Sequence, residues 1–214
     1  MGKRIVFIDG MRVITEEIDR VFSEVIPGAE LIHIVDEGIL KFEAESKQLK
    51  RRFCNLVLAA EESGADVVVI TCAHAIPSLP IVQSLVDLPV VQITLPMIEA
   101  AVQRGETIGI VSTERTIVQP IVRLLEKAGE EANKRITVKV GLCEEAFQAR
   151  LSGDTDRYDA LVMKTIEDLS ETVDVVVLAQ ISSGRVVPKI KEKVNRPILS
   201  PLAIAAERIR TILG

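Results

Sequence analysis

A short apolar strand followed by a cysteine and a histidine constrains the fold of this chain more than any other segment. Residues 67–70 are four consecutive β-branched residues within the run DVVVITCAHAI, and Cys72 and His74 follow directly. A strand that is apolar on both faces is typical of the middle of a parallel sheet, and ligands of such sheets bind beyond the carboxyl ends of the strands. We therefore expect Cys72 and His74 at a functional edge of a sheet, with a helix over 76–86.

The same segment occurs a second time, 108 residues later. Residues 174–199, which begin DVVVLAQISS, align without a gap with residues 66–91, and seven positions are identical, including prolines at two separate points. We interpret this as an internal duplication in which Gln180 takes the place of Cys72.

Strands and amphipathic helices alternate along the whole chain, a pattern typical of an open parallel sheet with helices on both faces. Helices with one apolar face are predicted around 49–60 and 117–125. Because the chain is duplicated, the strands divide into two four-stranded units of about 100 residues each, whose strands are expected to end toward a common cleft. The predicted strands cover residues 4–8, 30–35, 66–71, 89–93, 107–111, 136–141, 174–179 and 197–199.

Composition and charge exclude several classes of function. The 214 residues carry a net charge of -5 with acidic and basic residues interspersed, so neither nucleic acid nor a membrane surface is an expected partner. The amino terminus runs directly into a strand, and no apolar run approaches transmembrane length, so we expect a cytoplasmic protein. The three cysteines and two histidines show no metal-binding spacing, so no metal site and free thiols are predicted.

Residues just past the strand ends are the candidates for lining the cleft. Several of these positions also begin helices, where backbone N–H groups and the positive helix end favour a bound carboxylate. They are Asp9, Gly10, Cys72, Ala73 and His74 in the first unit, and Ser112, Thr113, Gln180, Ile181, Ser182 and Ser183 in the second.

The layout of these segments resembles the aspartate/glutamate racemase superfamily. The resemblance rests on Asp9 after the first strand, TCAHA after the third, IGIVSTERT at the fifth and LAQISSG at the repeat-related place, and it covers essentially the whole chain. The superfamily includes aspartate, glutamate and hydantoin racemases, maleate isomerase and arylmalonate decarboxylase, which work without pyridoxal phosphate, so no cofactor is expected. In its two-base racemases a cysteine follows the third strand of each half, and the two thiols face opposite sides of the substrate's α-carbon. Cys72 matches the first cysteine, whereas Gln180 occupies the position of the second.

The resemblance also implies the domain organisation. We predict an α/β fold of two pseudo-symmetric flavodoxin-like lobes with the site between them. Lobe 1 would comprise residues 1–95 plus 200–214 and carry Cys72, and lobe 2 would comprise residues 96–199 and carry Gln180. A homo-oligomer is common among relatives.

Each candidate catalytic residue has a functional and a structural interpretation. A helix amino terminus favours the thiolate, so Cys72 can act as an acid/base, although a small buried cysteine is the structural alternative. His74 could tune that thiol, transfer protons itself, or only cap the next helix. Asp9 could bind a substrate ammonium group, orient a proton-transfer group, or cap the following helix.

The remaining candidates suit substrate binding. Ser112 and Thr113 match polar residues of the family and are expected to bind a carboxylate. Gln180, Ser182 and Ser183 donate hydrogen bonds but are not bases at neutral pH. Gly10, Ala73 and Ile181 complete the predicted binding set, whereas Cys54, Cys143 and His33 are interpreted as structural.

The sequence therefore predicts a cofactor-independent isomerase in which Cys72 transfers a proton at the carbon α to a carboxylate or carbonyl. A small amino acid, hydantoin or dicarboxylate is the substrate class that the resemblance implies. Two alternatives remain open at this point: a one-thiol decarboxylase of malonate-type acids, and a non-catalytic carboxylate-binding sensor.

Overall fold

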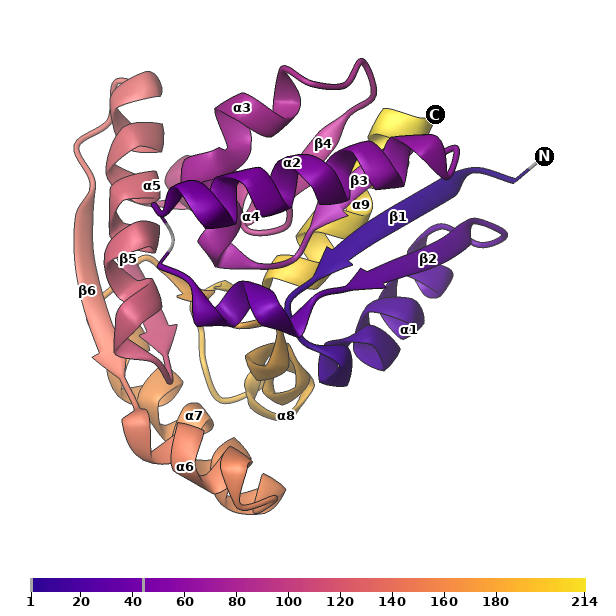
Figure 1. The fold of residues 1–214 in the computed structure, drawn as a ribbon. Coiled ribbons are helices and arrows are strands. Elements are labelled where there is room, and N and C mark those ends of the chain that lie inside the picture. Colours follow the sequence, from indigo (N-terminus) through magenta and orange to yellow (C-terminus); the bar gives the residue numbers. More distant parts are fainter. Residues whose placement is uncertain (1, 44) are drawn as a thin grey trace. The chain divides into compact units, whose positions relative to one another are not determined.

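The computed structural model describes residues 2–43 and 45–214 as an α/β protein whose strands form two four-stranded parallel sheets (Figure 1). The strand orders are β2-β1-β3-β4 and β6-β5-β7-β8, the order of flavodoxin-like folds, so the predicted fold class is confirmed. Every predicted strand lies within one residue of an observed one at each end. The strands are β1 (Arg4–Asp9), β2 (Glu30–Val35), β3 (Val67–Ile70), β4 (Val90–Gln92), β5 (Thr107–Ser112), β6 (Thr137–Leu142), β7 (Val175–Leu178) and β8 (Ile198–Leu199).

Helices connect the strands, and short 3-10 helices follow several strand ends. The α-helices are α1 (Thr15–Val25), α2 (Lys47–Glu62), α3 (Leu79–Gln83), α4 (Leu95–Arg104), α5 (Val118–Glu131), α6 (Glu144–Leu151), α7 (Thr155–Ser170), α8 (Val187–Ile190) and α9 (Pro201–Leu213). The 3-10 helices are η1 (Arg12–Ile14), η2 (Glu37–Lys41), η3 (Ala73–Ser78), η4 (Arg115–Ile117) and η5 (Ile181–Val186).

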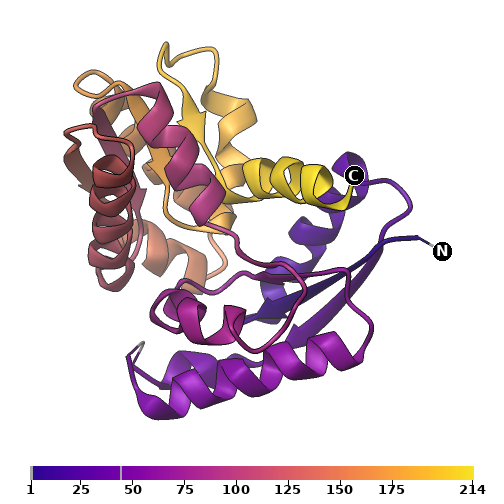
Figure 2. The same cartoon turned by 90° about the horizontal axis from the view of Figure 1, so that it is seen from above.

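The chain divides into two compact units, which we describe separately. Unit 1 runs to Thr94 and resumes at Ala205, and unit 2 spans Leu95–Ile204. In unit 1, α1 and α2 lie on opposite faces of the first sheet (Figure 2). In unit 2, one apolar cluster joins α4 and α5 to one face of the second sheet, and another joins α7 to the other face. Covered on both faces, the middle strands β3 and β7 are buried throughout, which explains their continuous apolar runs.

The duplication extends to the hydrogen bonds that begin each unit. Asp66 accepts a hydrogen bond from the Arg4 backbone N–H at 2.7 Å, and Asp174 accepts one from the Thr107 N–H at 2.9 Å. The backbone N–H groups of Thr107 and Glu106 hold the pKa of Asp174 below its usual range. Residues of the two units therefore correspond by position, so each unit provides an internal comparison for the other.

The segment after β3 differs from the expected helix over 76–86. A 3-10 helix, η3, begins directly after Cys72, and a short α-helix follows only over Leu79–Gln83. Pro80 explains the break, because it lacks the N–H group that an α-helix begun at Ile76 would need there, and Pro188 stands at the equivalent place at the start of α8.

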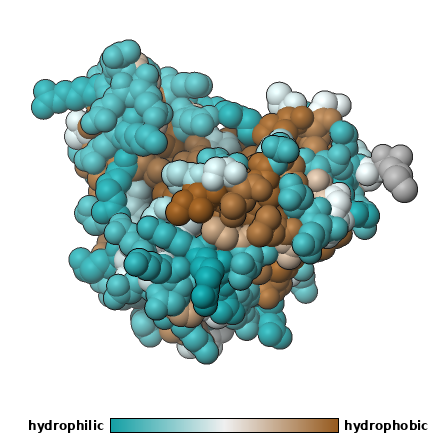
Figure 3. All heavy atoms as spheres, turned by 45° about the horizontal axis from the view of Figure 1, so that its top comes forward, coloured by the Kyte–Doolittle hydropathy of each residue, from teal (hydrophilic) through white to brown (hydrophobic). Residues whose placement is uncertain are grey.

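The exposed surface is mixed in character. In the described part of the chain, none of the helices has the length and apolar content needed to cross a membrane. Figure 3 shows one face on which apolar residues gather in the middle and hydrophilic residues border them. Large apolar side chains exposed over the molecule as a whole include Met11, Val13, Leu40, Leu58, Ile81, Leu85 and Leu151.

Candidate active site

The turn after β3 holds the thiol of Cys72 in a confined position. Cys72 is 9% exposed and precedes η3, with its Sγ atom 3.6 Å from Nδ1 of His74. A Cβ atom built on Gly10 would lie 3.4 Å from the same sulfur, so the loop after β1 passes close to the thiol. Two segments distant in sequence therefore meet at Cys72, as the carboxyl ends of adjacent parallel strands do.

Asp9 lies beside this turn with its carboxylate engaged on both oxygens. Asp9 is completely buried; its Oδ1 accepts a hydrogen bond from Oγ1 of Thr71 at 2.7 Å, and its Oδ2 accepts one from Nδ1 of His33 at 2.6 Å. The proposed capping role of Asp9 is wrong, because Met11 occupies the N-cap position of η1 and the Asp9 oxygens contact Thr71 and His33. Its contacts instead join the strand end of β1 to the residue before Cys72.

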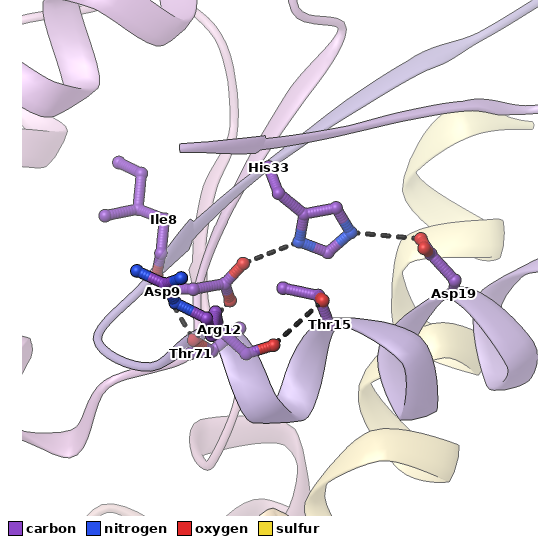
Figure 4. A network of polar contacts seen from close by, with 7 residues as sticks. All are labelled: Ile8, Asp9, Arg12, Thr15, Asp19, His33 and Thr71. Carbon is purple, nitrogen blue, oxygen red and sulfur yellow. Dashed lines mark hydrogen bonds and ion pairs between the residues drawn. The ribbon is translucent and has the colours of Figure 1, made fainter. Parts of the chain in front are cut away.

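His33 bridges two carboxylates on this face of the sheet (Figure 4). Its Nε2 atom lies 3.0 Å from Oδ1 of Asp19 in α1, and its ring stacks on that of Phe7, with centroids 4.9 Å apart. Carboxylates only accept hydrogen bonds, so both contacts are satisfied together only when both ring nitrogens carry protons. Burial lowers the pKa of His33, but the hydrogen bonds and charges of Asp9 and Asp19 outweigh it and raise that pKa above its usual value.

The stability of the chain should depend on the charge of His33. Because the pKa is raised in the folded state, the contribution is complete below the unfolded value of about 6.5 and is lost as pH rises through the folded value. We expect the difference in free energy of unfolding between the unaltered chain and His33→Gln to shrink as pH rises. Urea denaturation at about pH 6 and about pH 9 measures it. A difference that stays constant would contradict a charged His33.

His33 lies in the strand predicted for it, but its contact with two carboxylates was not predicted from the sequence. One signal in the sequence pointed toward it: side chains alternate between the two faces of a strand, so Phe7 and Asp9 share one face of β1. The contact could be predicted only with the register of β1 and β2, which places His33 opposite Phe7.

In unit 2, Gln180 stands at the position that corresponds to Cys72 in the repeat. Its side chain forms hydrogen bonds with residues at the end of β5. Its Oε1 atom accepts a hydrogen bond from the Thr113 N–H at 3.2 Å, and its Nε2 donates to Oγ1 of Thr113 at 3.0 Å and to Oγ of Ser112 at 3.4 Å. Ser112 is completely buried and also exchanges hydrogen bonds with the backbone of Glu114. The amide is therefore oriented by its neighbours and offers no group that transfers protons at neutral pH.

The serines after Gln180 contact a tyrosine that was not among the predicted site residues. The Tyr158 hydroxyl of α7 lies 3.1 Å from Oγ of Ser182 and 2.9 Å from Oγ of Ser183, and all three residues are buried. Ile181, beside them, is buried as well. Nothing in a single sequence indicates that α7 delivers its tyrosine here, because the contact spans 24 residues.

Comparisons with known proteins agree with this layout. The sequence profile of the Asp/Glu/Hydantoin racemase family matches residues 12–209. The chain belongs to this family. No curated protein matches it significantly.

Solved structures of racemases share the fold of the chain at low sequence identity. An allantoin racemase from Klebsiella pneumoniae superposes with a TM-score of 0.76 at 16% identity, over 99% of this chain and 88% of that one. A glutamate racemase isoform from Bacillus anthracis gives 0.71 at 20% identity, over 99% and 81%. An aspartate racemase from Picrophilus torridus gives 0.72 at 14% identity, over 99% and 94%. Family membership supports a racemase-type isomerase.

Within this racemase-family chain, the predicted site residues form two groups. Asp9, Gly10, Cys72, Ala73 and His74 gather at the carboxyl edge of the first sheet, and Ser112, Thr113, Gln180, Ile181, Ser182 and Ser183 gather at that of the second. Among residues 2–43 and 45–214, no three His, Cys, Asp or Glu side chains are arranged to hold a metal ion.

Proposed function

We propose that the chain is a cofactor-independent racemase or isomerase in which Cys72 transfers a proton at the carbon α to a carboxylate or carbonyl. The substrate class is a small amino acid, hydantoin or dicarboxylate. The observation that carries the proposal is the Cys72 thiol at the carboxyl end of β3, 3.6 Å from His74, in a chain of this family. The allantoin, glutamate and aspartate racemases that share the fold support the same class of reaction.

The chemistry assigns a distinct task to each proposed residue. Removing an α-proton needs a base. A thiolate is a suitable base because the pKa of a cysteine thiol, about 8.5, lies close to the pH at which the enzyme would work. His74 would exchange a proton with that thiol or hold it in its ionised form. Gly10 and Ala73 would leave room for the substrate beside the sulfur. The substrate carboxylate would be bound by backbone and side-chain donors of Ser112, Thr113, Gln180, Ile181, Ser182 and Ser183.

The amide of Gln180 favours a second candidate, a decarboxylase of malonate-type acids. Loss of CO₂ generates the carbanion without any base, so a single thiol suffices to deliver the proton that completes the reaction. Because Gln180 is held by Thr113 and transfers no proton, a one-thiol reaction fits this chain.

Incubation with a panel of acids in ²H₂O tests the proposal. The panel contains small amino acids, hydantoins, dicarboxylates and substituted malonates. We expect deuterium at the α-carbon of at least one acid, detected by NMR and mass spectrometry. An unchanged carbon skeleton indicates racemisation or isomerisation, and a product in which a deuteron has replaced the lost CO₂ indicates decarboxylation. Binding of an acid without exchange or mass change would overturn both candidates and favour a sensor.

A further inference from the structure

We propose that His33 is a positioning residue for Cys72: its imidazolium holds Asp9, and Asp9 in turn holds Thr71 at the turn that carries the thiol. The inference rests on the proposed function, because it assigns His33 to the machinery that supports the thiol.

The contacts form one continuous chain from the surface to the thiol turn. Asp19, whose side chain is half exposed, contacts Nε2 of His33, and Nδ1 of His33 contacts the buried Asp9. Asp9 then accepts a hydrogen bond from Thr71, whose backbone N–H also bonds the carbonyl of Ile8. Because Thr71 directly precedes Cys72, each link restricts the backbone that places the sulfur.

The groups that face His33 define its charge. Within the described residues, the titratable side chains that contact it are Asp9 of β1 and Asp19 of α1, and the ring of Phe7 covers it. Arg12, the first residue of η1, forms an ion pair with Glu37 instead. With His33 neutral, the two carboxylates of Asp9 and Asp19 carry a net charge of -2. Protonation of His33 reduces the net charge of the three groups to -1.

Unit 2 builds the same fold without this network. The repeat offset of 103 that relates β1 to β5 and α1 to α5 places Ser112 at the position of Asp9 and Val122 at that of Asp19. The strand registers place Val140 opposite Ile110 as His33 lies opposite Phe7. Ala179 replaces Thr71, in the segment where Gln180 replaces Cys72. The charged network is therefore found in the unit that carries the thiol.

The energetics point the same way. A buried carboxylate is costly unless it is paired, and a buried ion pair adds little stability over apolar residues of similar volume. Since unit 2 folds with serine, valine and alanine at these positions, the sheet itself does not require the network. If the network positions the Cys72 thiol, its presence in unit 1 is explained despite the free-energy cost of burying charged groups.

The first test transfers the residues of unit 2 into unit 1 as Asp9→Ser, Asp19→Val, His33→Val and Thr71→Ala. This set removes every member of the network together, so no charge is left buried without a partner. We expect a folded protein whose kcat for α-proton exchange falls about tenfold or more while KM changes less than about threefold, the pattern of a displaced catalytic group. An unchanged kcat in the folded variant would overturn the proposal. The control Asp159→Asn removes the charge of a buried carboxylate that pairs with the partly exposed side chains of Arg185 and Lys189 in unit 2, and it should leave kcat unchanged.

The second test uses the unaltered chain and needs no substrate, so its failure is distinct from failure of the proposed function. The chain has two histidines, and His74→Asn assigns their ¹⁵N signals. We expect both ring nitrogens of His33 to carry protons in its charged form and to lose one with a midpoint above about 6.5, the ordinary value for histidine. The rate at which iodoacetamide alkylates Cys72, followed by peptide mass spectrometry, should show a step at that midpoint. A His33 midpoint at or below about 6.5, or an alkylation profile without that step, would overturn the inference even if exchange is found.

Discussion

Replacing Cys72 by serine is expected to lower the rate of α-proton exchange by about 10³-fold, within the range that acid/base groups contribute to catalysis. A hydroxyl keeps nearly the shape of the thiol but is hardly ionised at neutral pH, so the base is lost. Binding of the acid should change little, because Cys72 is a small side chain in a confined turn. Deuterium incorporation in ²H₂O measures the rate, and calorimetry measures the affinity.

Cys54→Ser is the matched control, since it removes a thiol from α2 that is not among the predicted site residues. Its exchange rate should equal that of the unaltered chain. Full activity in Cys72→Ser would assign the chemistry to another residue and end the proposal for the thiol. Activity lost equally in both variants would point to a general defect in folding.

Replacing Gln180 by cysteine is expected to raise racemisation about tenfold or more, because a second proton donor then completes the pair of groups that acid/base catalysis needs. A single base removes a proton from one face of the α-carbon, and inversion requires an acid on the other. We predict from the family resemblance that the second thiol of two-base racemases stands at this position. Circular dichroism of an enantiopure acid follows the racemisation directly.

Gln180→Ser isolates the effect of the new thiol. Both variants lose the hydrogen bonds of the amide to Thr113 and Ser112, at a cost of about 1–2 kcal/mol in stability. If both raise racemisation equally, the gain comes from removing the amide. If neither raises it while Cys72→Ser still abolishes exchange, the one-thiol decarboxylase gains support.

The sequence alone determined the α/β class, the two four-stranded sheets and the position of Cys72. Runs such as residues 67–70 are apolar on both faces, and only a strand covered on both sides accommodates them. The duplication supplied the division into four and four strands. The correspondence of Asp66 with Asp174 in sequence reappears in equivalent hydrogen bonds. These features follow from short-range patterns, which a single sequence displays directly.

The tertiary structure decided what the site residues contact. His33 meets Asp9 because β1 and β2 pair in one register, and a shift of one residue would turn His33 to the other face of the sheet. Tyr158 reaches Ser182 and Ser183 because α7 packs across β7. Such contacts join residues that are far apart in sequence, and their partners depend on strand register and helix packing, which no local pattern specifies.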